Sequence, residues 1–160
     1  MKPTTEYTIS EKLEALKIHL MENENFTAEE AEEAFFDERF ETFQCGSWEY
    51  MVLTEEEADK ATRESILESL WAFRAEFILH HTAFYQESNE REDEAFCEAL
   101  EALQGKLCES ANPIVKALIM NLDDFVDDAT QYDGRGHFLN TYNGEENESD
   151  GGRFYIYRIN

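Results

Sequence analysis

Three Thr-x-x-Glu boxes, each leading into apolar residues at helical spacing, constrain the fold of this chain more than any other feature. They run from Thr8 to Glu11, from Thr27 to Glu30 and from Thr54 to Glu57. In such a box the Thr hydroxyl accepts a hydrogen bond from the backbone N–H three residues later, and the Glu carboxylate accepts one from the Thr N–H. We therefore predict that helices begin after residues 8, 27 and 54.

Apolar residues recur every three or four positions after the boxes, which is the repeat of one helix face. The first predicted helix carries Ile9, Leu13, Leu16 and Leu20 at this spacing. The third carries a longer set, namely Ile66, Leu70, Phe73 and Phe77, widened by Leu67, Trp71 and Ile78. We expect this third segment to be one long helix and the central element of the core.

Two further helices are predicted in the second half of the chain. A polar break at residues 89–91 precedes an apolar stripe of Phe96, Leu100, Leu103 and Leu107. Asn112-Pro113 places a cap before a Pro at the first helical position, and it precedes the stripe Val115, Leu118, Leu122, Phe125 and Ala129. The chain is therefore expected to form about five helices.

The apolar period changes from about four to two in three short segments, which is typical of strands. These are Trp48–Leu53, His137–Tyr142 and Arg153–Ile159. Asn143-Gly144 and Asp150-Gly151-Gly152 supply tight turns between the last two. We predict an α+β fold that is predominantly helical, with a small antiparallel sheet built from a mid-chain strand and a C-terminal hairpin.

The chain is strongly acidic, with 37 Asp and Glu against 13 Lys and Arg and a net charge of −24. Its composition is nevertheless 42% hydrophobic and 13% aromatic. Disordered acidic tails lack such residues, because they cannot bury enough apolar area to offset the loss of chain entropy. We therefore expect one folded acidic domain that spans residues 1–160.

The charge also limits the partners. Direct binding to nucleic acid or to an anionic membrane requires a positive surface, which this composition does not offer. Residues 1–6 lack the apolar segment of a secretory signal, and no apolar run approaches the roughly 20 residues that a bilayer span needs. We expect a cytoplasmic protein that binds neither nucleic acid nor membrane directly.

Acidic residues are clustered along the predicted helices. Two clusters are candidate partner-binding sites, and they comprise Glu29, Glu30, Glu32, Glu33, Asp37 and Glu38, followed by Glu55, Glu56, Glu57 and Asp59. The first is the densest, and Arg39 is its only base. Other acids line the fourth and fifth predicted helices, namely Glu90, Glu92, Asp93, Glu94, Glu98 and Glu101, then Asp123, Asp124, Asp127 and Asp128.

Such clusters destabilise a compact chain, because like charges at helical spacing repel one another. Solubility needs a net charge of only about 2–8 in a small domain. One interpretation is therefore imitation of a polyanion, in which rigid acidic helices occupy the basic nucleic-acid-binding cleft of another protein. The alternative is an ordinary solvated acidic surface.

The C-terminal segments DGRGH (133–137), YNGEE (142–146) and FYIYRIN (154–160) are the most distinctive. Together with LTEEEAD (53–59), they resemble a group of small acidic proteins encoded by phages, prophages and plasmids. The resemblance implies a phage-like genetic setting rather than a reaction. By analogy with small acidic inhibitors of restriction enzymes and CRISPR effectors, it favours an inhibitory decoy that acts on a host defence or DNA-binding protein.

Two other functions stay open. Asp133, Arg135 and His137 could provide an acid, an anion clamp and a base for a small enzyme. The structural interpretation is that Gly134 and Gly136 turn the chain and Arg135 pairs with an acid. A third possibility is a non-catalytic accessory module that binds a protein through exposed aromatic residues. No cofactor or metal ion is expected, because no ligand spacing for one is present.

Overall fold

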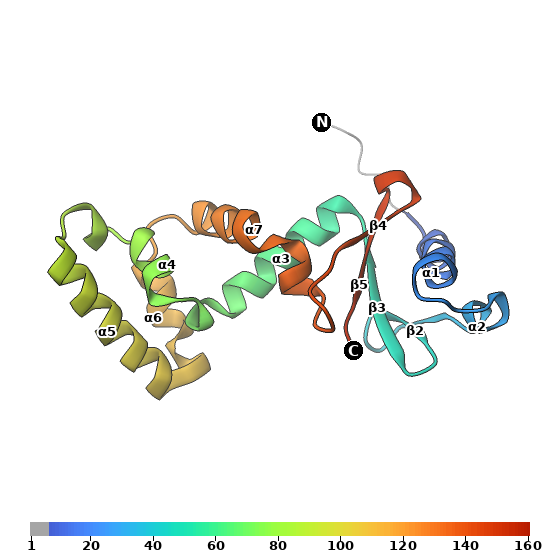
Figure 1. The fold of residues 1–160 in the computed structure, drawn as a ribbon, viewed down its shortest axis with the longest axis horizontal. Coiled ribbons are helices and arrows are strands. Elements are labelled where there is room, and N and C mark those ends of the chain that lie inside the picture. Colours follow the sequence, from blue (N-terminus) through green and yellow to red (C-terminus); the bar gives the residue numbers. More distant parts are fainter. Residues whose placement is uncertain (1–6) are drawn as a thin grey trace. The chain divides into compact units, whose positions relative to one another are not determined.

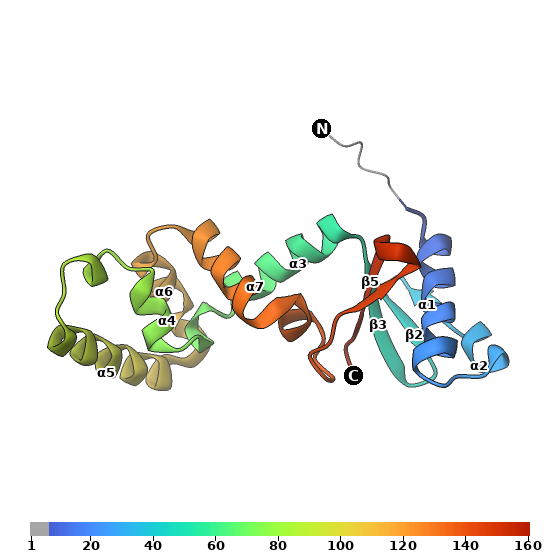
Figure 2. The same ribbon diagram turned by 45° about the horizontal axis from the view of Figure 1, so that its top comes forward.

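The computed structural model describes residues 7–160, which divide into two compact units. Among these residues, unit 1 contains those up to Thr62 together with Arg135–Asn160, and unit 2 contains Arg63–Gly134. Figures 1 and 2 show the elements of both units. Two helices, α3 (Glu55–Glu68) and α7 (Leu122–Leu139), contribute residues to each unit. The single-domain prediction stays a prediction.

Unit 1 is built on a five-stranded antiparallel sheet with the order β1-β2-β3-β5-β4. The strands are β1 (Phe35–Asp37), β2 (Thr42–Cys45), β3 (Trp48–Leu53), β4 (Asn147–Ser149) and β5 (Phe154–Arg158). The C-terminal strand β5 lies between β3 and β4 and pairs Tyr50 with Arg158 and Asn147 with Ile156. The sheet therefore combines strands from residues 35–53 with strands from residues 147–158.

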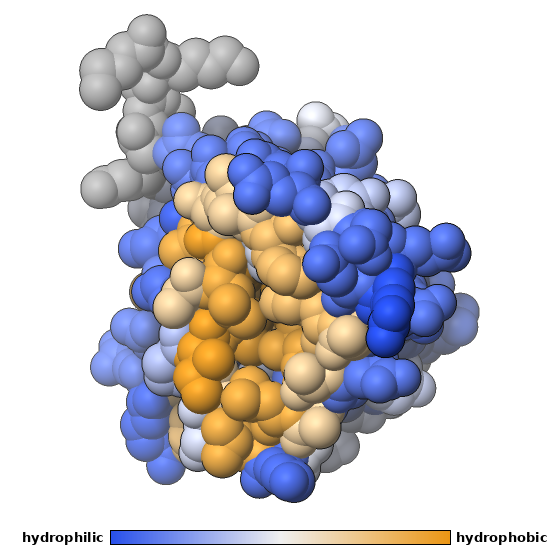
Figure 3. Space-filling view, turned by 90° about the vertical axis from the view of Figure 1, so that its left-hand side faces the viewer, coloured by the Kyte–Doolittle hydropathy of each residue, from blue (hydrophilic) through white to orange (hydrophobic). Residues whose placement is uncertain are grey.

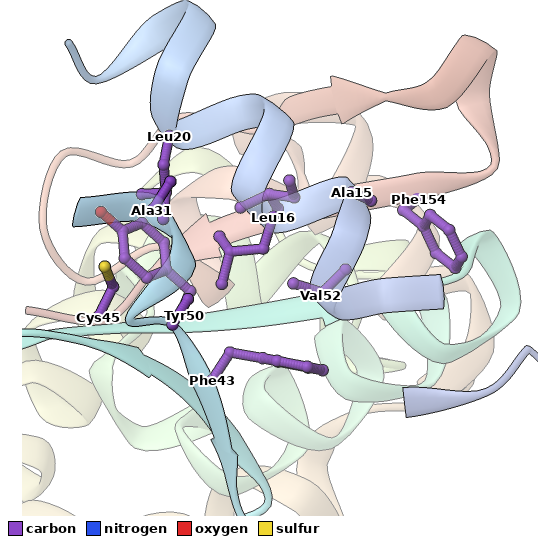
Figure 4. Close-up of a cluster of buried hydrophobic side chains, with 11 residues drawn as sticks. Ala15, Leu16, Leu20, Ala31, Phe43, Cys45, Tyr50, Val52 and Phe154 are labelled. Carbon is purple, nitrogen blue, oxygen red and sulfur yellow. The ribbon is translucent and has the colours of Figure 1, made fainter. Parts of the chain in front are cut away.

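One face of this sheet is covered by α1 (Ile9–Asn23) and α2 (Ala28–Glu32). Leu16 and Leu20 of α1 are fully buried, and Figure 4 shows them above Tyr50 and Val52 of β3. The opposite face carries the alternate residues of the same strands. There Tyr157 packs with Ala58 and Leu139. Both faces thus carry packed apolar side chains, although Met51, Leu53 and Tyr155 on the second face are only partly buried.

Unit 2 consists of helices and short turns. Besides parts of α3 and α7 it contains α4 (Ala75–His80), α5 (Glu90–Leu107) and α6 (Asn112–Leu118), with 3₁₀ turns at Leu70–Ala72, Phe84–Gln86 and Cys108–Ala111. Phe125 is fully buried, and its ring centroid lies 5.0 Å from those of both Phe73 and Phe77. This aromatic cluster forms part of a core separate from that of unit 1.

The α+β class is confirmed, and so are the three capping boxes. Thr8, Thr27 and Thr54 each donate their backbone N–H to the Glu three residues on, at 2.8 Å. The mid-chain strand and the pairing of the C-terminal strand with it are also as predicted. The strand arrangement differs from the expected hairpin, because β1 and β2 were missed and the segment from His137 was misassigned.

The long third helix was wrong, because the chain leaves the helix after Glu68 and resumes it in α4. Two side-chain amides satisfy backbone groups that this break frees. Asn112 donates to the Leu67 carbonyl at 2.7 Å and accepts from the Trp71 N–H at 3.0 Å. Gln104 donates to the carbonyls of Trp71 and Phe73. Because these partners lie 31–45 residues away, the local apolar period could not reveal the break.

The second predicted helix is also shorter than expected, since it ends at Glu32 and the chain enters β1. Phe36 of β1 lies opposite Phe43 of β2, with ring centroids 5.0 Å apart. Aromatic residues favour strands, where they pack against cross-strand neighbours. The fifth predicted helix is divided in the same way into α6 and α7, because the Met120 N–H bonds to the His81 carbonyl at 2.9 Å instead of within a helix.

The predicted strand at residues 137–142 was wrong as well. Helix α7 continues to Leu139 across a kink at Gly134, where φ is 78° and ψ is 157°. Leu139 is buried against Ala58 and Tyr157, and this packing favours the helix over an extended segment. The C-terminal hairpin is instead formed by β4 and β5, with the predicted Asp150–Gly152 turn between them.

Candidate functional site

Of the ten acids chosen from the sequence, six are exposed and, among residues 7–160, pair with no base. They are Glu29, Glu30, Glu33, Glu38, Glu55 and Glu56. They do not lie on one helix face, because α2 ends before Glu33 and Glu38 follows β1. Glu30 is also engaged in its capping box, where the Thr27 N–H lowers its pKa. The first cluster is therefore not the continuous ridge that the sequence indicated.

The other four acids are neutralised by nearby bases. Lys17 lies 2.8 Å from Glu32, Lys12 lies 2.6 Å from Glu57 and Arg135 lies 2.8 Å from Asp59. Asp37 is only 8% exposed and is bonded by Arg39, whose guanidinium lowers the pKa of the carboxyl. Asp37 therefore does not belong to an exposed acidic surface.

Helix α5 presents a different acidic surface, outside the two clusters proposed from the sequence. It begins after Asn89, which forms a capping box with Glu92. Four exposed acids occupy one side of it at helical spacing, namely Glu90, Glu94, Glu98 and Glu101. We call these four residues the α5 stripe. Among the described residues, no Lys or Arg forms an ion pair with any of them, so the stripe faces solvent without a paired base.

The charge density along α5 is comparable to that of a nucleic-acid strand. Residues 90–101 hold six acids and one base, Arg91, over about 17 Å, since a helix rises about 1.5 Å per residue. This is one acid per roughly 3 Å, against one phosphate per about 3.4 Å along a DNA strand. Consecutive members of the stripe lie about 5–6 Å apart at their Cβ atoms. The helix thus arranges fixed negative charges at a polyanion-like spacing.

The acids of α7 are more strongly compensated. Arg63 lies 2.6 Å from Asp123, and His81 lies 3.1 Å from Asp128. Asp124 and Asp127 are exposed. Unit 2 as a whole holds 16 acidic against 5 basic residues, so its own net charge is −11. The α5 stripe therefore belongs to a strongly negative unit.

Unit 2 also exposes a large apolar face. Figure 3 shows apolar side chains gathered around a hollow, bordered by hydrophilic residues. This view faces the end of the molecule where Figure 1 labels α4, α5 and α6. The exposed large apolar residues of unit 2 are Phe84, Tyr85, Leu107, Ile114, Met120 and Tyr132. Contiguous apolar surface of this kind is typical of a protein-binding site.

The DGRGH segment takes the structural role that the sequence allowed for Arg135. The Arg135 guanidinium lies 2.8 Å from both Glu146 and Asp59, and its ring contact is with Tyr155. These bonds raise the pKa of Arg135. Asp133 and His137 are exposed, and among the described residues no hydrogen bond joins either of them to Arg135. The structure therefore does not assemble the three as a catalytic group.

Within residues 7–160, no three His, Cys, Asp or Glu side chains are grouped so that they could hold a metal ion. None of the helices in this part of the chain combines the length and apolar character of a bilayer span. Comparisons with protein-family models, with curated proteins and with solved structures found no match. The functional proposal therefore rests on the chain itself.

Proposed function

We propose that this protein is a phage-like inhibitory decoy, which binds the basic nucleic-acid-binding surface of a host protein through the α5 stripe. The observation that carries the proposal is the stripe itself, four exposed acids on one side of a helix with no ion-paired Lys or Arg among the described residues. A cationic cleft that binds phosphates would attract it over long range, because opposite charges steer association.

This proposal moves the contact surface from unit 1 to unit 2. The acids first chosen in unit 1 are divided between different elements, and four of them are paired with bases. An acid that already pairs with a base offers little net charge to a partner. The acids of the α5 stripe pair with no base among the described residues, and all four lie on one helix.

A second candidate is the accessory protein-binding module, and the apolar face in Figure 3 favours it. In that case the apolar side of a partner helix would fill the hollow, and burial of apolar area would provide the affinity. Salt separates the two candidates, because it screens charges but does not weaken apolar burial.

The experiment is a pull-down from bacterial lysate with the full chain, at about 50 mM and about 200 mM salt and with duplex DNA as competitor. The test variant is Glu94→Lys, Glu98→Lys and Glu101→Lys. The control is Glu33→Lys, Glu38→Lys and Glu56→Lys in unit 1. Each changes the net charge from −24 to −18, so only the position of the change differs.

For the decoy, we expect duplex DNA and higher salt to release the captured proteins, and we expect only the α5 variant to lose them. Equal loss in both variants would show that net charge alone matters and would overturn the placement. Capture that survives both salt and DNA would contradict the decoy and favour the accessory module. Substitution of Met120 by Lys should then abolish the capture.

A further inference from the structure

Unit 1 contains a pocket of about 280 Å³ that the acidic surface does not include. Its lining is almost entirely polar and comes from α1, β3, the loop after α7, β4 and β5. It includes His19, Glu24, Tyr50, Asn143, Asn147 and Arg158. At about 30 Å³ for each water molecule, the space corresponds to roughly nine waters. It can therefore hold a small molecule of comparable size.

Tyr50 is the most informative residue of the pocket lining. The side chain is fully buried, yet no described residue forms a hydrogen bond with its hydroxyl. Figure 4 shows the hydroxyl directed away from Leu16 and Val52. A buried hydroxyl without a partner is costly, so native structures rarely keep one unless a ligand or water bonds to it.

Two charged groups of the pocket are also short of direct partners. Glu24 lies 3.7 Å from the Nε2 atom of His19 and 3.9 Å from an Nη atom of Arg158. Both distances exceed that of a direct hydrogen bond. Burial lowers the pKa of His19, so the imidazole is neutral at pH 7. A hydroxyl placed among these groups could donate to Glu24 and accept from Tyr50 or Arg158.

Arg158 is held rigidly, as a binding group should be. Its guanidinium carbon lies 3.8 Å from the ring centroid of Trp48 and 3.6 Å from that of Tyr142. The Nε atom donates to the backbone carbonyl of Asn160, and the residue is only 9% exposed. Stacking between two aromatic rings fixes the plane of the guanidinium. Its remaining N–H groups are thus available in a defined position.

The loop that closes the pocket is built by the distinctive C-terminal residues. Asn140 is buried, accepts from the N–H groups of Tyr142 and Asn143, and donates to the Glu145 carbonyl at 2.8 Å. Gly136 permits this loop to approach α7 closely, because a Cβ there would lie 2.4 Å from the Gly144 oxygen. The conformation that brings Asn143 and Glu145 to the pocket is therefore specified by Asn140, which also lines the pocket, and by Gly136, which does not.

We propose that this pocket binds a small neutral molecule with several hydroxyl groups, such as a monosaccharide or a cyclic polyol. Hydroxyl groups both donate and accept, which matches a lining of amides, a phenol, a carboxylate and a guanidinium. A carboxylate or phosphate ligand only accepts and would meet Glu24, Glu145 and the net charge of −24. An ammonium ligand only donates and would meet the fixed charge of Arg158.

The test is ligand-observed NMR and calorimetry on the full chain with D-glucose, D-galactose and myo-inositol. Glucose 6-phosphate and putrescine are the anionic and cationic probes. We expect at least one neutral probe to bind and the charged probes not to bind. Tyr50→Phe should weaken that binding about tenfold, since it deletes one hydrogen bond to the ligand. Glu24→Gln, which keeps the shape of the side chain, should also weaken it.

Tyr157→Phe is the matched control, because Tyr157 is buried on the opposite face of the same sheet and should leave the affinity unchanged. The proposal is overturned if none of the neutral probes binds, if a charged probe binds instead, or if Tyr50→Phe and Glu24→Gln bind as tightly as the original chain. A crystal structure with ordered water alone at Tyr50 in saturating polyol would also overturn it. These outcomes are independent of the decoy, which concerns unit 2.

Discussion

Tyr50 and Tyr157 are fully buried on neighbouring strands of one sheet, but their hydroxyl groups are in opposite situations. The Tyr157 hydroxyl donates a hydrogen bond to Glu146, which is also bonded by Arg135. Tyr50 belongs to the lining of a polar pocket, and its buried hydroxyl has no hydrogen-bond partner among the described residues. Tyr50 pairs with Arg158, and the two residues share one face of the sheet. Because adjacent residues on a strand point to opposite faces, Tyr157 points to the other face. The contrast gives the first prediction.

Replacement of each tyrosine by Phe should change stability in different ways. Tyr157→Phe should lower the free energy of unfolding by about 1–2 kcal/mol, because it leaves Glu146 short of a donor. Tyr50→Phe should leave it within about 0.5 kcal/mol or raise it slightly, since it removes a buried hydroxyl that has no partner. Urea unfolding followed by circular dichroism measures both. A large loss in Tyr50→Phe would mean that its hydroxyl has a structural partner.

The break between α3 and α4 should depend on Asn112. Asn112→Ala removes one donor and one acceptor from the backbone groups of Leu67 and Trp71. We expect a loss of about 2–3 kcal/mol, because these groups are then left without partners. Gln131→Ala, an exposed substitution on α7, is the control and should change stability by less than about 0.5 kcal/mol. Equal effects in thermal unfolding would show that the amide is not needed at the break.

Two glycines in helices should respond oppositely to the same change. A Cβ on Gly136 would lie 2.4–2.8 Å from backbone atoms of residues 144–146, which cannot move without displacing the loop. Gly136→Ala should therefore destabilise the chain by about 2 kcal/mol or more. Gly105 in α5 has open space around it, so Gly105→Ala should stabilise by about 0.5–1 kcal/mol. Urea midpoints of the two variants would contradict this prediction if they shifted in the same direction.

His19 should make stability depend on pH. Burial lowers the pKa of its imidazole in the folded chain, while in the unfolded chain the pKa is near 6.5. As the pH falls below about 6.5, the unfolded chain binds a proton that the folded chain does not, so stability falls. We expect the stability of the original chain relative to His19→Gln to decrease between about pH 7.5 and pH 5.5. A difference that stays constant over this range in urea unfolding would contradict the prediction.

Features that depend on neighbours in the sequence could be predicted. The capping boxes join residues three positions apart, and all three formed as expected. The alternation of Trp48–Leu53 was enough to locate β3, since a strand buried on a sheet repeats every two residues. The helix end at Gly134–Leu139 was misread, because two glycines suggested a turn. The packing of Leu139 against Tyr157, 18 residues later, decides it in favour of the helix.

The sequence by itself determined the α+β class, the helix starts and the large excess of negative charge. Only the tertiary structure decided which acids stay uncompensated, because Glu57 meets Lys12 across 45 positions and Asp59 meets Arg135 across 76. The same holds for the pocket, whose lining combines residues 19–50 with residues 140–158. It holds also for the Tyr50 hydroxyl, which is buried without a hydrogen-bond partner among the described residues. Charge and periodicity are properties of composition and local order. Pairing and burial depend on which distant side chains the fold brings together.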